Sequence, residues 1–184
     1  SNPYVPHLSP VMTMNSMYEL RGYDGFKHIG HPTEYTMNKD TARILKQGYY
    51  ASVSYIDAQF GKVLKHLDDL GIADNTVIIV WGDHGWKLGE HNGWCKQSNY
   101  NIDIHVPMVV YSPKIENQGH QSFEITELID MYPSLCELAG INAPAYLQGT
   151  SFVPLITEPE REWKTAAFSQ FHRRPKVTPD GKRY

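Results

Sequence analysis

The chain has 184 residues, of which 41% are hydrophobic and 20% are charged, and its formal net charge is −3. This composition is that of an ordinary globular protein. A mild negative charge gives no reason to expect a nucleic acid or an anionic membrane as a partner. No apolar run approaches the length that spans a bilayer, so we expect no membrane-embedded function.

Residues 1–37 contain several prolines and glycines and show no sustained hydrophobic periodicity. A loop-rich segment of this length is uncommon in a compact domain unless it is functional or packs onto other structure. We therefore predict that residues 1–37 form a covering segment. Residues 1–20 lack the basic start and apolar middle of a signal peptide. The first residue is Ser1 rather than Met, so we expect a processed or cut product.

A long helix is predicted from about residue 38 to residue 70. Apolar residues recur at helical spacing from Leu45 to Leu70. Asn38 is a suitable N-cap, and Gly71 suits the position just after a helix end. Because the apolar stripe is wide and aromatic, we expect it to lie against a sheet.

The remaining pattern alternates strands and helices. Residues 76–81 and 106–111 are predicted strands, residues 125–138 a helix, and residues 166–170 a third short strand. Pro133 predicts a kink or break of that helix near Met131. Such alternation favours an α/β fold with a mostly parallel sheet flanked by helices. Three strands are too few for a covered sheet, so we expect part of a domain.

The loop after the first strand concentrates the residues suited to chemistry. The strand stops before Gly82, and Asp83 and His84 follow at once. Glycines at 82 and 85 let the chain leave strand geometry, so the two side chains can converge. Ligands of open α/β sheets bind beyond the carboxyl ends of strands, and a carboxylate beside an imidazole suits a divalent metal. The alternative is that Asp83 caps a turn and His84 is an ordinary loop histidine.

The same loop carries two lysines and an aromatic wall. Lys96 is a candidate ligand for sulfate or phosphate oxygens, whereas Lys87 is better interpreted as a solvated surface lysine. Trp86 is a candidate pocket wall, with a hydrophobic cluster that pins the loop as the alternative. His91 is a candidate to turn inward, where a supporting role is favoured over direct chemistry.

Four segments in register resemble the sulfatase family, and most closely its iduronate-type branch. They are residues 50–57, residues 83–91, Lys96 with residues 105–107, and residues 148–155. The likeness runs from about residue 38 to residue 172. It implies the C-terminal part of a catalytic domain with an alkaline-phosphatase-like α/β sandwich. Residues 173–184 would then be an exposed end that leads to a further subdomain.

The resemblance also implies a chemistry. Family members hydrolyse sulfate esters with a formylglycine nucleophile, while calcium holds the nucleophile and the sulfate oxygens. By residue match, Asp83 and His84 are implied metal ligands and Lys96 the implied catalytic, sulfate-binding lysine. Trp86 and His91 are implied to line the substrate pocket. The implied substrate is a sulfated carbohydrate, such as a glycosaminoglycan, or a small sulfate ester.

The family also implies a formylglycine-generating enzyme as a maturation partner, and a periplasmic, secreted or lysosomal location. This chain itself contains no targeting signal. Neither Cys95 nor Cys136 lies in the Cys/Ser-x-Pro-x-Arg motif that is converted to formylglycine, and no serine does. We therefore expect the nucleophile and the first metal-ligand pair in an N-terminal half outside this chain, and no turnover by this fragment alone.

The residues leave alternatives open for both the metal and the function. His84 suits zinc as well as calcium, because calcium prefers oxygen ligands. Zinc or manganese with a Ser or Thr nucleophile would indicate a phosphatase, phosphodiesterase or phosphonate hydrolase of the same superfamily. A non-catalytic glycan-binding protein that keeps the fold is the alternative from another class.

Overall fold

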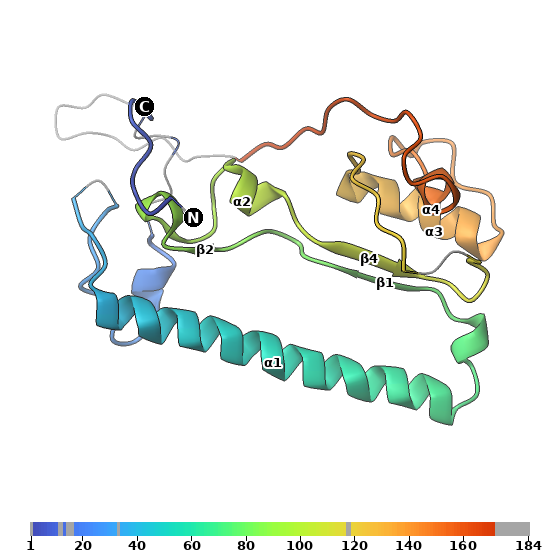
Figure 1. Cartoon of the computed structure of the whole chain (residues 1–184), viewed down its shortest axis with the longest axis horizontal. Coiled ribbons are helices and arrows are strands. Elements are labelled where there is room, and N and C mark those ends of the chain that lie inside the picture. The colour runs from blue at the N-terminus through green and yellow to red at the C-terminus, as the bar shows by residue number, and fades with distance from the viewer. Residues whose placement is uncertain (1, 11–12, 14–16, 33, 117–118, 172–184) are drawn as a thin grey trace. The chain divides into compact units, whose positions relative to one another are not determined.

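The computed structural model describes residues 2–10, 13, 17–32, 34–116 and 119–171 (Figure 1). Within these residues the chain forms two compact units. Unit 1 contains residues up to 59, residues 82–107 and residues from 169 onward, and unit 2 contains residues 60–81 and 108–168. The predicted exposed end, residues 173–184, lies outside the described residues. No helix of the described residues is long and apolar enough to cross a bilayer.

Helix α1 runs from Lys39 to Asp69, as its periodicity predicts. Asn38 caps its start, since the Asn38 Oδ1 atom accepts a hydrogen bond from the Thr41 N–H at 2.8 Å. Gly71 has a φ of +66°, the left-handed conformation that commonly ends a helix. No side chain of α1 is buried within the described structure. The expected packing of its apolar stripe on a sheet is therefore not confirmed.

Unit 1 has a small hydrophobic core that joins the N-terminal segment to a later loop. Met17, Leu20 and Ile29 pack with Trp94 and Cys95, and each is at most 4% exposed. Burial of these side chains supplies the main driving force that holds the N-terminal segment on the loop.

Polar contacts reinforce the same attachment. The Asn92 Nδ2 atom donates to the carbonyl oxygens of Pro32 and Tyr35 at 2.7 and 3.0 Å. These bonds satisfy two backbone acceptors of a segment without regular structure. The loop is folded back on itself by strands β2, Lys87–Leu88, and β3, Trp94–Cys95, which pair antiparallel. The short helix α2, Asn101–Ile104, follows.

Unit 2 contains strands β1, Ile78–Trp81, and β4, Met108–Tyr111, at the two predicted places. They pair antiparallel, with Ile78 opposite Tyr111, and run side by side in Figure 1. The predicted mostly parallel sheet is thus not confirmed, because both ladders of the described residues are antiparallel. A parallel pair needs a long crossover, usually a helix. The α-helix within residues 82–107 is the four-residue α2, which is too short for such a crossover, and the chain returns antiparallel.

Two further helices of unit 2 follow β4. Helix α3 runs from Met131 to Ala139 after a 3-10 turn, and it ends at Gly140 with a φ of +72°. Pro133 lies in the first turn of α3, where a proline is tolerated, so the predicted break near Met131 is confirmed. Helix α4 spans Val153–Thr157. The predicted strand at 166–170 is wrong, since these residues form neither helix nor strand.

Asp130 is the buried polar centre of unit 2. Its side chain is fully buried, and its carboxylate accepts the N–H groups of Glu127 and Thr150 at 2.8 and 2.7 Å. The Lys164 ammonium donates to both oxygens of Asp130 at 2.8 Å and to Glu127 at 3.0 Å. Gly149 must be a glycine, because a Cβ there would lie 2.1 Å from the Ile129 carbonyl oxygen.

The Glu127–Lys164 contact gives unit 2 a definite pH dependence. The Phe168 N–H and then the Lys164 ammonium lower the pKa of Glu127 below its ordinary 4.5. Burial opposes the charge of Lys164, but hydrogen bonds to Asp130 and Glu127 outweigh it and raise the Lys164 pKa above 10.5. A lowered carboxyl pKa stabilises the fold above 4.5, and a raised ammonium pKa stabilises it below 10.5.

We predict that Glu127→Gln lowers stability at neutral pH and reduces the loss of stability as the pH falls below 4.5. Guanidinium unfolding followed by circular dichroism over a pH series measures both effects. Glu116→Gln, a change outside this cluster, is the control. An unchanged acid limb in Glu127→Gln would contradict the assignment.

Candidate active site

Asp83 and His84 do converge beyond the end of β1. The His84 Nε2 atom lies 3.5 Å from Asp83 Oδ2, and the His84 N–H donates to Asp83 Oδ1 at 3.0 Å. The His84 Nδ1 atom lies 2.9 Å from the Gly85 carbonyl oxygen. A carbonyl oxygen only accepts hydrogen bonds, so Nδ1 carries the proton in the neutral ring and Nε2 keeps its lone pair.

This donor set fits a divalent cation. When the His84 ring is neutral, its Nε2 lone pair and the Asp83 Oδ2 atom lie close enough to bind the same cation. The Asp83 side chain is 81% exposed. The Gly85 carbonyl fixes the ring orientation, as second partners of metal-binding histidines do. Among the described residues, no cluster of three or more His, Cys, Asp or Glu side chains could hold a metal. Asp83 and His84 can supply two ligands to such a cation.

Trp86 is the residue around which the predicted site side chains gather. Its ring stacks with the His84 ring at a centroid distance of 6.3 Å and with the Tyr49 ring at 6.5 Å. The Lys96 Nζ atom lies 5.5 Å from the centroid of the Trp86 ring, within the range of a cation–π contact. The structure thus brings His84, Trp86 and Lys96 together, and Tyr49 joins them from α1.

Lys96 has a carboxylate partner that no sequence pattern indicates. Its Nζ atom lies 3.3 Å from Glu19 Oε1, and the two side chains are 28% and 23% exposed. The Glu19 Oε2 atom is buried without a hydrogen-bond partner among the described residues. Glu19 lies in the aperiodic N-terminal segment, so no local pattern signals its contact with a residue 77 positions later.

Lys87 is not the solvated lysine that the sequence predicts. It is 1% exposed, and its ammonium pairs with Asp103 and donates to Ser98 Oγ at 2.9 Å. The prediction fails because the carboxylate partner lies 16 residues away on α2, beyond any local spacing rule. His91 stacks on Tyr100 at a centroid distance of 4.6 Å, which places it against the Lys87 side of the loop.

Cys95 is not suited to nucleophilic chemistry. It is 3% exposed, and burial, followed by the charge of Glu19, raises the pKa of its thiol to about 12. A thiolate rather than a thiol is the reactive form, so Cys95 is inert at neutral pH. This agrees with the absence of a modification motif around it.

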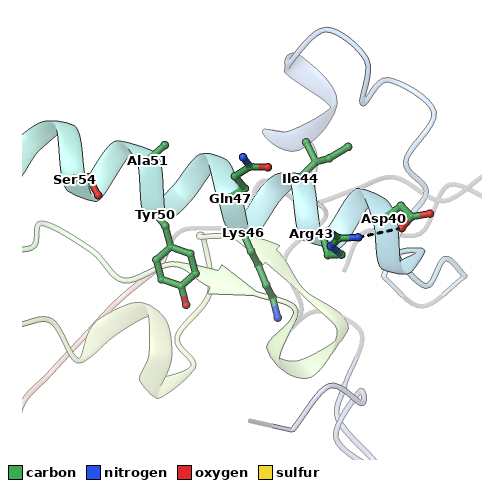
Figure 2. Close-up of a pocket in the computed structure, with 8 residues that line it drawn as sticks. All are labelled: Asp40, Arg43, Ile44, Lys46, Gln47, Tyr50, Ala51 and Ser54. Atoms are coloured by element: carbon green, nitrogen blue, oxygen red, sulfur yellow. Dashed lines mark ion pairs between the residues drawn. The ribbon is translucent and has the colours of Figure 1, made fainter.

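The described residues also form a surface pocket. Figure 2 shows it along α1, lined by Asp40, Arg43, Ile44, Lys46, Gln47, Tyr50, Ala51 and Ser54. All of these belong to one helix, and none is a predicted site residue. The pocket gives no support to a second reaction centre.

The Sulfatase family model matches residues 14–141. This chain belongs to the sulfatase family. It is 32% identical to human iduronate 2-sulfatase over 95% of this chain and 36% of that protein. It is 30% identical to the N-acetylglucosamine-6-O-sulfatase of Bacteroides thetaiotaomicron, over 69% of this chain and 23% of that enzyme. The family resemblance expected from the residues is confirmed.

Solved structures give the same family fold. One protein, solved in complex with its substrate D-glucosamine-2-N,6-O-disulfate, aligns with a TM-score of 0.64 and 30% identity over 73% of this chain and 28% of that chain. The phosphonate monoester hydrolase of Silicibacter pomeroyi aligns with a TM-score of 0.67 and 28% identity over 77% of this chain and 27% of that chain. This sulfatase-family chain has part of an alkaline-phosphatase-like α/β fold and spans about a third of the curated relatives it matches.

We predict that the Cys95 thiol of the folded protein resists alkylation by iodoacetamide at neutral pH, because burial keeps it protonated. Mass spectrometry of the peptide that contains Cys95, before and after guanidinium unfolding, measures the difference. Equal labelling in the two states would show that this part of the core opens freely.

Proposed function

We propose that this chain is the part of a sulfuric ester hydrolase that provides the second metal-ligand pair and the sulfate-binding lysine. The observation that supports the proposal is the contact of both His84 and Lys96 with the Trp86 ring, because two separately predicted groups meet the same aromatic side chain. Family membership supports the same reaction class.

The chain's own residues have distinct roles in this proposal. Asp83 and His84 would hold a calcium ion, which supplies positive charge to the sulfate oxygens and the nucleophile when bound. The Lys96 ammonium binds a sulfate oxygen and stabilises charge that develops on the group in transfer. Trp86 fixes Lys96 and closes one side of the site, and His91 with Tyr100 supports the loop.

Glu19 is an ion-pair partner of Lys96 with which a bound sulfate ester would compete. In this structure its carboxylate neutralises the lysine at 3.3 Å. A sulfate ester that binds must share or displace this ion pair, because the same ammonium would face both anions. The N-terminal segment thus contributes directly to the proposed site, in addition to its predicted covering role over residues 1–37.

The proposed substrate is a sulfated carbohydrate or a related sulfate ester. The names of the relatives and the bound glucosamine disulfate of one neighbour support this class. The complete protein would be matured by a formylglycine-generating enzyme and would act in a periplasmic, secreted or lysosomal compartment. Its nucleophile would come from outside residues 38–172, the segment that we assign to the C-terminal part of the catalytic domain.

Calcium is the proposed metal because the segment matches are to sulfatases, and zinc is the alternative that His84 allows. The β1–β4 pair is proposed to lie in a larger, mostly parallel sheet of the complete domain. A phosphonate ester hydrolase is the second candidate function, since one such enzyme aligns with a TM-score of 0.67.

We predict that the complete protein, produced with a formylglycine-generating enzyme, hydrolyses an aryl sulfate faster than the matching aryl phosphonate ester. Release of the chromogenic phenol from both esters measures this ratio. Chelation should abolish the activity, and calcium should restore it better than zinc. Faster phosphonate hydrolysis, restored best by zinc, would replace the proposed function by the second candidate.

We predict that Asp83→Ala and Lys96→Ala each lower kcat/KM by about 100-fold or more, because each removes a group that stabilises the transferring charge. The exposed Asp83 can be replaced with little change in melting temperature, whereas Lys96→Ala leaves Glu19 without its ion pair and should lower the melting temperature modestly. Lys27→Ala, an exposed lysine of the same unit, is the matched control. Near-normal activity of both site variants would refute the assignment.

A further inference from the structure

The loop of the proposed site contains a second charged cluster that the reaction does not use. Lys87, Ser98 and Asp103 are 1%, 5% and 4% exposed. The Lys87 ammonium donates to Ser98 Oγ at 2.9 Å and pairs with Asp103 Oδ2, and the Ser98 hydroxyl donates to the same carboxylate oxygen. We refer to these three residues as the buried anchor.

Lys87 is too enclosed to bind a substrate. The Gly93 backbone packs so closely on it that a Cβ at residue 93 would lie 2.7 Å from Lys87 Cδ. The Tyr100 ring covers its ammonium at 5.8 Å from the ring centroid, and His91 stacks on Tyr100. The two lysines of this loop therefore have different roles, since Lys96 remains 28% exposed and Lys87 does not.

The buried anchor is connected to both ends of the proposed site. At one end, the Gly85 N–H donates to the Asp103 carbonyl oxygen at 2.8 Å, directly after His84. A Cβ at residue 85 would lie 1.8 Å from the Ile102 carbonyl oxygen, so the two segments are in close contact. At the other end, Lys87 pairs with Cys95 in the β2–β3 ladder, directly before Lys96.

The loop around these residues does not adopt a locally preferred backbone conformation. His91, Asn92, Cys95 and Gln97 are non-glycine residues with φ between +54° and +83°. L-residues rarely adopt this left-handed region, so such backbone persists only where surrounding contacts enforce it. The hydrogen bonds of the buried anchor join Lys87, which precedes this strained stretch, to Ser98 and Asp103, which follow it.

We propose that Lys87, Ser98 and Asp103 are positioning residues, whose buried hydrogen-bonded ion pair sets the distance between the Asp83–His84 pair and Lys96. The catalytic meaning of this inference rests on the proposed function. The buried anchor then holds both the metal-ligand pair and Lys96, which face the sulfate from two sides. Removal of either charge displaces both groups.

A double-mutant cycle in the complete protein tests the proposal. The variants are Lys87→Met, Asp103→Leu and the two combined, with Lys27→Met as the matched control on an exposed lysine of the same unit. Each single change should lower the melting temperature and kcat, because it leaves a buried charge unpaired. In the combined variant an apolar pair fills the space, so the melting temperature should recover while kcat stays about tenfold low or lower.

Recovery of kcat together with the melting temperature would show that the pair only stabilises the fold, and would overturn the proposal. Ser98→Ala keeps both charges and removes one small hydroxyl, so it should fold even where the charge variants do not. We expect Ser98→Ala to reduce kcat several-fold while KM changes less. An unchanged kcat in this variant would also overturn the proposal.

A readout that needs no turnover separates this inference from the proposed function. Hydrogen exchange of the Gly85 and Gly89 amides, which bond to Asp103 and Gly93, reports opening of the loop. Exchange should be faster in Ser98→Ala than in wild type and unchanged in Lys27→Met, whether or not sulfate esters are cleaved. Equal exchange in Ser98→Ala and wild type overturns the buried anchor, whereas absent sulfatase activity overturns only the proposed function.

Discussion

The burial of a lysine against an aspartate is the constraint on which the site loop depends. A charge removed from water is tolerated only when a partner and hydrogen bonds replace the lost hydration. Lys87 meets this condition only if residue 103 returns to residue 87, so the pair specifies how the loop closes. Because an apolar side chain could pack in several positions while this ion pair has one geometry, the pair selects a single loop conformation.

The described residues of both units contain a buried carboxylate paired with a lysine. In unit 2 the fully buried Asp130 is paired with Lys164 and with backbone N–H groups. Among the described residues of unit 1, the hydrophobic core cluster has five buried apolar residues. Where apolar burial is limited, specific polar pairs must distinguish the native arrangement from other compact ones. The polar pairs therefore provide specificity, while the core supplies most of the driving force.

The sequence predicts the elements well and the long-range pairing poorly. Helix α1, its Asn38 cap, strands β1 and β4 and the break before α3 follow from periodicity and local backbone rules. The antiparallel return of β4 does not, because it depends on what residues 82–107 fold into. The predicted strand at 166–170 fails for a related reason, since Phe168 donates its N–H to Glu127 rather than to a strand.

The candidate site divides in the same way. Asp83, His84, Trp86 and Lys96 are predictable from the sequence because they lie in one short loop after a predicted strand. The contacts of Glu19 and Asp103 are not predictable, because their partners are distant in sequence and only the fold brings them together.

The pairing of residues that are distant in sequence also determines when unit 2 can finish folding while the chain is synthesised. The Asp130 carboxylate accepts hydrogen bonds from the N–H groups of Glu127 and Thr150 and from the Lys164 ammonium. As the chain leaves the ribosome, α3 emerges before residue 150 and well before residue 164, so Asp130 at first remains hydrated at the helix start. Unit 2 can expel that water and close only once Lys164 has left the ribosome, so its assembly follows the synthesis of all three partners of Asp130.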